Sequence, residues 1–176
     1  ISTLGFRGEA LASIASVSEV EIISKTKDCE FGGKIRCVNG KIEEPMQIGT
    51  IDGTRIKVSN LFTNIPARLK FMRKDKTEEN DITNYIARLI LANPSINFTY
   101  IADGKTIYKH TSSDLKNAIL DIYGYDIEDN LLEVKERRDQ LIVSGFIGRP
   151  ELAKSNKTHQ TLIINGRYVV NNVVAS

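Results

Sequence analysis

Residues 53–72 read GTRIKVSNLFTNIPARLKFM, a stretch that combines a strand pattern with the start of a helix. Polar and apolar residues alternate from Thr54 to Val58, which predicts a strand with one face toward a core. The alternation ends at Leu61-Phe62. Pro66 then fits the first position of a helix, where its missing N–H costs nothing.

Basic residues occupy the predicted exposed positions after this proline: Arg68, Lys70, Arg73, Lys74 and Lys76. Such a cluster can pair with phosphates, or it can be a solvated helix face. The hydroxyl of Thr54 leaves two alternatives as well, because it could hold a polar ligand group or bond to a neighbouring strand.

Upstream, residues 5–14 read GFRGEALASI, and we expect a short helix over Gly8–Ala15. The glycines could simply let the chain turn into that helix. Alternatively, they could present backbone amides to an anion, since the first N–H groups of a helix have no intrahelical partners and carry partial positive charge.

Downstream, the dipeptides Asn39-Gly40, Asp103-Gly104 and Asn165-Gly166 each predict a hairpin turn. A helix over Glu78–Ala92 is expected to bury one apolar stripe, made of Ile82, Tyr85, Ile86, Leu89 and Ile90. A second helix is predicted over Asp114–Tyr123, with Ser113 as its N-cap and Gly124 as its C′ residue. Helices and antiparallel strands mix without strict βαβ alternation, which indicates an α+β fold with two lobes divided near Ser112.

The composition is that of a folded, water-soluble chain: 176 residues, 41% apolar and 26% charged, with a net charge of +2. No apolar run approaches the ~20 residues of a membrane span, and no signal peptide is recognisable. Cys29 and Cys37 are expected to be free thiols. We find no metal-ligand cluster, paired carboxylates or Ser/His/Asp set, so no metal site and no catalytic residue is predicted.

A third stretch, NKTHQTLIINGRYV at residues 156–169, follows a loop that contains Lys154 and includes Lys157. The hairpin turn before Arg167 presents its guanidinium at a loop tip. Tyr168 could stack on a base, although such a tyrosine is more often half-buried in its sheet.

Taken together and in this order, the three stretches resemble the DNA mismatch-repair MutL family, and the resemblance runs over essentially the whole chain. It implies a GHKL-type ATPase fold. Residues 1–112 would be the C-terminal part of the ATP-binding α/β sandwich, from the end of the ATP lid onward. Residues 113–176 would be part of a second, transducer-like α/β lobe that faces DNA.

The resemblance also implies roles for individual residues. The end of the ATP lid would comprise Gly5, Phe6, Arg7, Gly8, Glu9, Ala10 and Leu11. Thr54 would line the nucleotide pocket. Arg167 lies in the part of the second lobe that faces DNA in the family, and we expect Lys154 and Lys157 to add to a DNA-binding surface.

The family's general-base Glu, its magnesium-binding Asn and its D-x-G-x-G adenine motif would lie before Ile1, and its second-lobe lysine would lie beyond Ser176. The chain therefore looks like a piece of a longer protein. ATP and Mg²⁺ would act in the intact protein, whereas we expect this piece to bind neither and to be inactive as an ATPase.

In the intact protein, the resemblance implies an ATP-driven switch that binds DNA without sequence preference and pairs its N-terminal regions when ATP binds. Its partners would be a mismatch-recognition protein and a downstream nuclease or helicase. It would reside in the bacterial cytosol, near the nucleoid, or in a eukaryotic nucleus, with no membrane partner. Two rival interpretations are a topoisomerase B-type GHKL subunit and a non-enzymatic interaction module.

Overall fold

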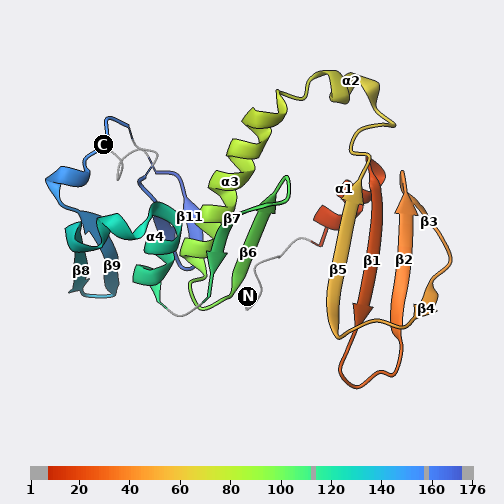
Figure 1. The fold of residues 1–176 in the computed structure, drawn as a ribbon, viewed down its shortest axis with the longest axis horizontal. Helices are drawn as coiled ribbons and strands as arrows, with labels where there is room; N and C mark the ends of the chain where they lie inside the picture. Colours follow the sequence, from red (N-terminus) through yellow and green to blue (C-terminus); the bar gives the residue numbers. More distant parts are fainter. Residues whose placement is uncertain (1–7, 112–113, 157–158, 172–176) are drawn as a thin grey trace. The chain divides into compact units, whose positions relative to one another are not determined.

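The computed structural model describes residues 8–111, 114–156 and 159–171, and Figure 1 shows the course of the chain. Its contacts divide it into two compact units, Ile1–Arg73 (unit 1) and Lys74–Ser176 (unit 2). This division lies upstream of the predicted domain boundary at residue 112. A compact unit is not the same as a functional lobe, so that boundary stays a prediction.

Unit 1 is an antiparallel sheet with two short helices. Its elements are α1 (Ala10–Ser16), β1 (Glu19–Lys25), β2 (Gly32–Val38), β3 (Lys41–Ile42), β4 (Met46–Ile48), β5 (Gly53–Ser59) and α2 (Pro66–Lys70). The strand order is β3-β2-β1-β5, and β4 also pairs with β2. Ile22 in β1 lies opposite Ile35 in β2 and Ile56 in β5, so this register places the apolar positions of the three strands on one face.

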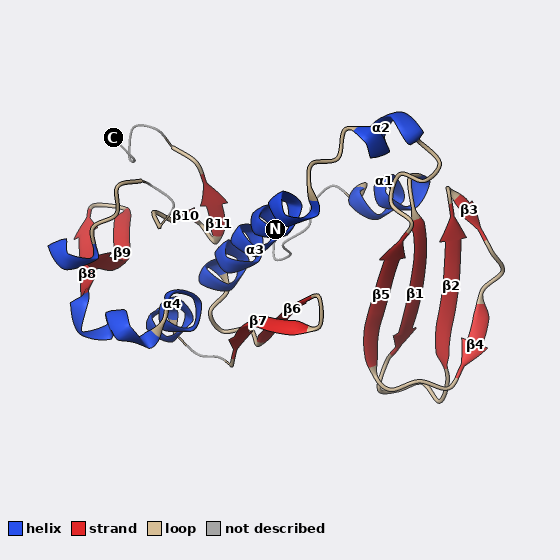
Figure 2. Ribbon diagram, turned by 45° about the horizontal axis from the view of Figure 1, so that its top comes forward, coloured by secondary structure: helices blue, strands red, loops and turns tan. Residues whose placement is uncertain are grey.

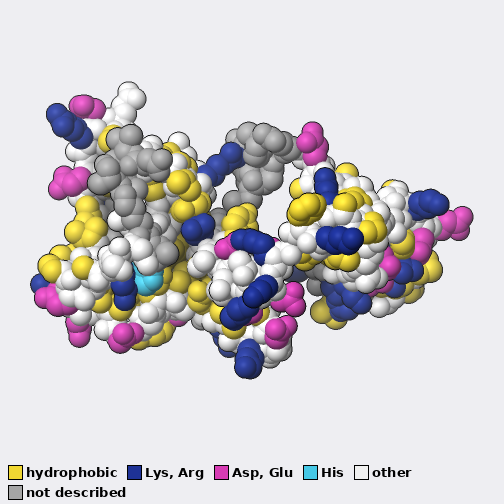
Figure 3. Space-filling model, turned by 90° about the horizontal axis from the view of Figure 1, so that it is seen from above, with side chains coloured by type: hydrophobic (Ala, Val, Ile, Leu, Met, Phe, Trp, Pro, Cys, Tyr) yellow, Lys and Arg dark blue, Asp and Glu magenta, His cyan; other side chains and the backbone are white. Residues whose placement is uncertain are grey.

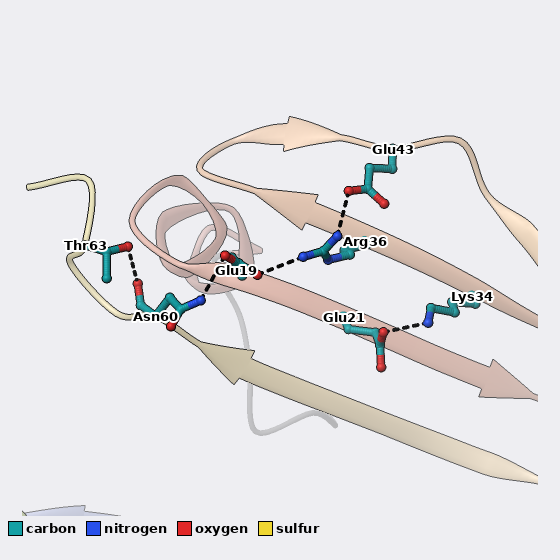
Figure 4. Close-up of polar contacts among 7 residues, drawn as sticks. All are labelled: Glu19, Glu21, Lys34, Arg36, Glu43, Asn60 and Thr63. Carbon is teal, nitrogen blue, oxygen red and sulfur yellow. Dashed lines mark hydrogen bonds and ion pairs between the residues drawn. The ribbon is translucent and has the colours of Figure 1, made fainter.

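The opposite face of this sheet carries a network of charged side chains, drawn in Figure 4. Arg36 bonds to Glu19 at 2.9 Å and to Glu43 at 3.2 Å. Asn60 also donates to Glu19, at 2.9 Å. The hydrogen bonds from Asn60 and Arg36 hold the pKa of Glu19 below its usual value. The network ties the end of β5 to the middle of the sheet.

Unit 2 combines a long helix with shorter helices and antiparallel strand pairs (Figure 2). Its elements are α3 (Asp75–Ala92), β6 (Phe98–Ala102), β7 (Lys105–His110), α4 (Leu115–Tyr123), the 3₁₀ helix η1 (Tyr125–Asn130), β8 (Leu131–Arg138), β9 (Leu141–Gly148), the 3₁₀ helix η2 (Pro150–Leu152), β10 (Leu162–Ile164) and β11 (Arg167–Val169). β6 pairs with β7, β8 with β9 and β10 with β11.

The core of unit 2 lies between α3 and α4. Ile90 and Ala118 are fully buried and Leu91 is 5% exposed. The predicted stripe on α3 is wrong in its first half, because Ile82 is 52% and Tyr85 is 60% exposed. Among the described residues, the buried positions of α3 are Ala87, Ile90 and Leu91. Only the C-terminal half of the helix therefore packs into the core.

The N-cap of α4 is Asp114, one residue later than predicted. Its carboxylate accepts a hydrogen bond from the Asn117 amide at 2.7 Å, which satisfies one of the helix's free N–H groups. Gly124 directly follows the helix, as predicted, with a φ of 100° that favours glycine, but its ψ of 153° lies outside the left-handed helical region expected of a C′ residue.

The three predicted hairpin turns are confirmed, at Asn39-Gly40, Asp103-Gly104 and Asn165-Gly166. Both residues of each turn have positive φ, between 47° and 82°, the conformation that Asn-Gly and Asp-Gly favour. The mixture of helices with antiparallel strands confirms the α+β class. None of the helices in the described residues is long and apolar enough to cross a membrane.

Candidate functional site

The N-terminal end of α1 is open to solvent. Gly5, Phe6 and Arg7 lie outside the described residues. Gly8 has a φ of 68°, and no atom of the described residues lies within 4 Å of the position a Cβ would take. Glu9, at the N-cap position, makes no capping hydrogen bond with its side chain. Ala10 and Leu11 begin a helix that buries none of its residues, and Leu11 itself is 43% exposed. A ligand could therefore approach this backbone closely, as the anion-binding alternative requires.

The C-terminal end of α1 is held firmly by two loops. Four consecutive carbonyl oxygens accept hydrogen bonds from these loops: Ala15 from Gly40 N at 2.8 Å, Ser16 from Asn64 Nδ2 at 3.0 Å, Val17 from Phe62 N at 2.8 Å and Ser18 from Asn39 N at 3.1 Å. The last carbonyls of a helix have no intrahelical partners, and the bonds to Ala15 and Ser16 satisfy two of them, while Val17 and Ser18 directly follow the helix. The helix is thus anchored at one end and accessible at the other.

Thr54 lies at the other end of the sheet from α1. β1 starts at Glu19, close after α1, and Glu19 pairs with Ser59, whereas Thr54 pairs with Ser24 near the end of β1. The five steps from Thr54 to Ser59 span about 17 Å of strand. The Thr54 and Ser24 hydroxyls are 2.8 Å apart, so the strand-neighbour alternative holds. A hydroxyl can still make further hydrogen bonds, and the role of Thr54 in nucleotide binding stays a prediction.

The basic residues after Pro66 are mostly exposed. Arg68, in α2, places its guanidinium 5.7 Å from the centre of the Phe62 ring. Lys76, in α3, forms an ion pair with Glu79 at 3.0 Å. The structure therefore leaves both alternatives for this cluster open.

Arg167 is exposed at the first position of β11, directly after the Asn165-Gly166 turn. Lys154 is exposed beyond η2, and Lys157 lies outside the described residues. Tyr168 is half-buried, and the Arg88 guanidinium lies 4.3 Å from the centre of its ring. The half-buried alternative for Tyr168 is thus confirmed, and at least part of its ring is already in contact with a cation.

Sequence reasoning missed a hollow of about 400 Å³ within unit 2. Its lining combines polar and aromatic side chains, including Asn84, Arg88, Tyr108, Tyr123, His159 and Thr161. Asn84 and Arg88 are four residues apart on α3 and so share a helix face. That spacing could have been noticed, but the other residues come from elements far apart in the sequence.

Sequence reasoning also missed a buried histidine. His110 is fully buried at the end of β7. Its Nδ1 lies 2.7 Å from Asp121 Oδ2, and its Nε2 lies 2.7 Å from the Pro94 carbonyl oxygen. Burial by itself would lower the pKa of His110, but the hydrogen bonds to Pro94 and Asp121 raise it above its usual value. Since a carboxylate and a carbonyl oxygen both accept hydrogen bonds, this arrangement favours a ring with a proton on each nitrogen, in keeping with the raised pKa.

Comparison with known sequences finds close relatives over nearly the whole chain. The family model described as "DNA mismatch repair protein, C-terminal domain" matches residues 119–176. The DNA mismatch repair protein MutL of Clostridium botulinum is 42% identical over 170 residues, which are 96% of this chain and 26% of that protein. MutL of Streptococcus uberis is 43% identical over 172 residues, 97% of this chain and 26% of that protein. The chain thus spans about a quarter of the length of these curated relatives.

Solved structures give the same result for the fold. The Aquifex aeolicus MutL ATPase domain complexed with ADP superposes with a TM-score of 0.83 at 27% identity, covering 96% of this chain and 65% of that one. The N-terminal domain of a DNA repair protein superposes with a TM-score of 0.78 at 26% identity, covering 98% of this chain and 58% of that one. The predicted fold, part of a GHKL-type ATPase of the MutL kind, is confirmed.

Proposed function

The chain belongs to the MutL family of DNA mismatch repair proteins, and on this basis we propose that the intact protein is an ATP-driven switch in mismatch repair. It binds and hydrolyses ATP with Mg²⁺, binds DNA without sequence preference, and couples recognition of a mismatch to removal of a strand. The observation that carries the proposal is the 42% identity to MutL over 96% of the chain.

Nucleotide binding is supported by the similarity to a domain whose structure contains ADP. In our proposal, Gly5 to Leu11 form the closing edge of the ATP lid, and Thr54 lines the pocket. The open backbone at Gly8 supports the first assignment, because backbone amides at a helix start suit a phosphate. The assignment of Thr54 to the pocket rests on the family resemblance alone.

The remaining functional assignments concern the second lobe and the partners. The family match at residues 119–176 begins close to the proposed lobe boundary, which supports a transducer-like lobe over 113–176. In our proposal, Arg167, Lys154 and Lys157 of that lobe contribute to the surface that binds DNA. ATP binding pairs two N-terminal regions into a clamp, and a mismatch-recognition protein and a repair nuclease or helicase are its partners in the cytoplasm.

The isolated 176-residue chain is expected to show no ATP turnover above a protein-free blank. Phosphoryl transfer needs a positioned water, a metal and compensating charge acting together, and the D-x-G-x-G motif has no match in this sequence. An assay of phosphate release from Mg-ATP measures this turnover. Turnover that disappears in a Glu9→Gln variant would contradict this part of the proposal, since the lid segment would then carry catalysis itself.

DNA binding by the chain is expected to be weak and sensitive to salt. Basic and acidic side chains are interspersed on the face drawn in Figure 3, in keeping with the net charge of +2. Arg167→Glu should weaken binding of a duplex oligonucleotide and lower the slope of log K against log salt by about 1. Fluorescence anisotropy at several salt concentrations measures both quantities.

Lys105→Glu provides a matched control. Lys105 also follows directly after a two-residue hairpin turn in unit 2, and it is also exposed. Equal slopes for the Lys105→Glu and Arg167→Glu variants would show that the charge of Arg167 acts only through the net charge of the chain, and the DNA-facing assignment would be wrong.

A further inference from the structure

The loop between β5 and α2 links α1, the proposed end of the lid (the lid helix), with α2, which carries Arg68 and Lys70 (the basic helix). We propose that Asn64 is a positioning residue that couples α1 to α2, so that movement of the lid helix is passed to the basic helix. This inference rests on the proposed role of α1 as the end of the nucleotide lid. It is supported by a continuous series of contacts from α1 to α2 within unit 1.

The first step is the asymmetry of α1. Its N-terminal half is open to solvent, whereas the carbonyls of Ala15 to Ser18 are bonded to two loops. A helix held in this way can tilt about its fixed end when something binds at its open end. The pivot therefore lies at Ser16 and Val17, the residues whose carbonyls the β5–α2 loop holds.

The second step is the conformation of that loop. Asn60 and Phe62 have φ values of 54° and 61°. A left-handed conformation is common for Asn but strained for a bulky residue such as Phe, and it persists only where surrounding contacts hold it. Here the Phe62 N–H donates to Val17 O at 2.8 Å, and Asn60 is held by Glu19 at 2.9 Å (Figure 4). These hydrogen bonds hold the loop in one conformation.

The third step leads from the loop into α2. The Ile65 N–H donates to Phe62 O at 2.9 Å, and Leu69 N–H donates to Ile65 O at 3.2 Å. The Arg68 guanidinium lies over the Phe62 ring, 5.7 Å from its centre. A displacement of Phe62 thus displaces both the start of α2 and one of its basic side chains.

Asn64 is the residue whose identity matters in this link. Of the four bonds at the end of α1, those from Asn39, Gly40 and Phe62 use backbone N–H groups, which most other residues would retain. The bond from Asn64 Nδ2 to Ser16 O, 3.0 Å long, uses a side chain. A substitution at residue 64 therefore removes one anchor of α1 and leaves the other three in place.

The test is hydrogen–deuterium exchange of the purified 176-residue chain, without nucleotide, read on peptides that contain α1 and α2. Asn64→Ala should speed exchange in both helices about fivefold, as expected for the loss of one net hydrogen bond. Asn64→Asp keeps the shape but replaces the donor with an acceptor facing the Ser16 carbonyl, so it should be at least as disruptive. An Asp variant indistinguishable from wild type would overturn the proposal, because shape rather than donation would then matter.

Thr63→Ala is the matched control. The Thr63 hydroxyl bonds to Asn60 O at 2.9 Å within the same loop (Figure 4). If the Asn64 bond is what anchors α1, Thr63→Ala should leave exchange in α1 unchanged. An equal acceleration by Thr63→Ala would mean that any damage to the loop loosens the helix, which also overturns the proposal.

Coupling itself is measured with a double-mutant cycle. Ala12→Gly lowers the helix propensity of α1 at an exposed position, and its effect is read in α2. Asn64 contributes to the coupling if Ala12→Gly speeds exchange in α2 clearly less in the Asn64→Ala background than in the wild-type background, where the Phe62–Val17 bond acts together with the Asn64 bond. The same effect in both backgrounds would overturn the proposal. No nucleotide is present, so a failure of ATP or DNA binding would count against the proposed function and leave this result untouched.

Discussion

Replacing Asp121 with alanine is expected to destabilise unit 2 by about 3 kcal/mol, because it leaves a buried imidazolium without its carboxylate. His110 is fully buried, and its Nδ1 lies 2.7 Å from Asp121 Oδ2. The contact joins β7 to α4, and the second ring nitrogen joins β7 to the Pro94 carbonyl after α3. One side chain therefore connects three segments around the core. The hydroxyl of Tyr125 donates to the same carboxylate at 2.7 Å and would also lose its acceptor.

Native-state hydrogen exchange, read on peptides from β7 and α4, measures this loss. Peptides from β1 and β2 in unit 1 serve as an internal reference. Asp121→Asn is the matched variant, since its amide oxygen can still accept from His110 while the charge is gone; it should cost clearly less than alanine. Equal stability of the Asp121→Ala variant and the wild type would show that this contact does not stabilise unit 2.

The pH dependence provides a second check on the same contact. Burial lowers the pKa of His110, but the bonds to Pro94 and Asp121, together with the nearby charge of Asp114, raise it above the ordinary value of 6.5. A raised folded-state pKa means that the full stabilisation is present below about pH 6.5 and is lost as the pH rises through the folded-state value. The wild type should therefore lose unit 2 stability as the pH rises above 6.5, and the Asp121→Ala variant should lose less.

Local chemistry explains which parts of the fold could be predicted. Each predicted hairpin has an Asn-Gly or Asp-Gly pair at its turn, and these residues favour the required positive φ wherever they occur. Likewise, Pro66 begins α2 because its ring already has a helical φ. Such signals are contained in two or three neighbouring residues, so no knowledge of the tertiary structure is needed to use them.

The predictions that were wrong depended on tertiary contacts. Ser113 and Asp114 are both good N-cap residues, and the types of the neighbouring residues do not determine which of them caps the helix. In the structure, the carboxylate of Asp114 accepts from the Asn117 amide. The contacts of the candidate site could not be predicted at all. Asn64 reaches a carbonyl 48 positions earlier in the chain, and no periodicity in the sequence records that pairing. Similarly, His110 and Asp121 lie on different elements, and the sequence does not show that β7 ends against α4.

The apolar stripe predicted on α3 allows a direct test of burial. Ile82 and Ile90 belong to the same predicted stripe, yet Ile82 is 52% exposed and Ile90 is fully buried. Ile90→Ala should therefore destabilise unit 2 by about 3 kcal/mol, the sum of lost burial and an unfilled cavity beside Leu91 and Ala118.

Ile82→Ala should cost at most about 0.5 kcal/mol, because alanine has the higher helix propensity and little burial is lost. The two variants make the same chemical change on one helix, so their difference isolates burial. Unfolding by denaturant, monitored by hydrogen exchange in peptides from β6 and β7, measures the loss of stability in each variant. A cost for Ile82→Ala as large as that for Ile90→Ala would mean that Ile82 is covered in solution, and that the predicted stripe was right where the structure contradicts it.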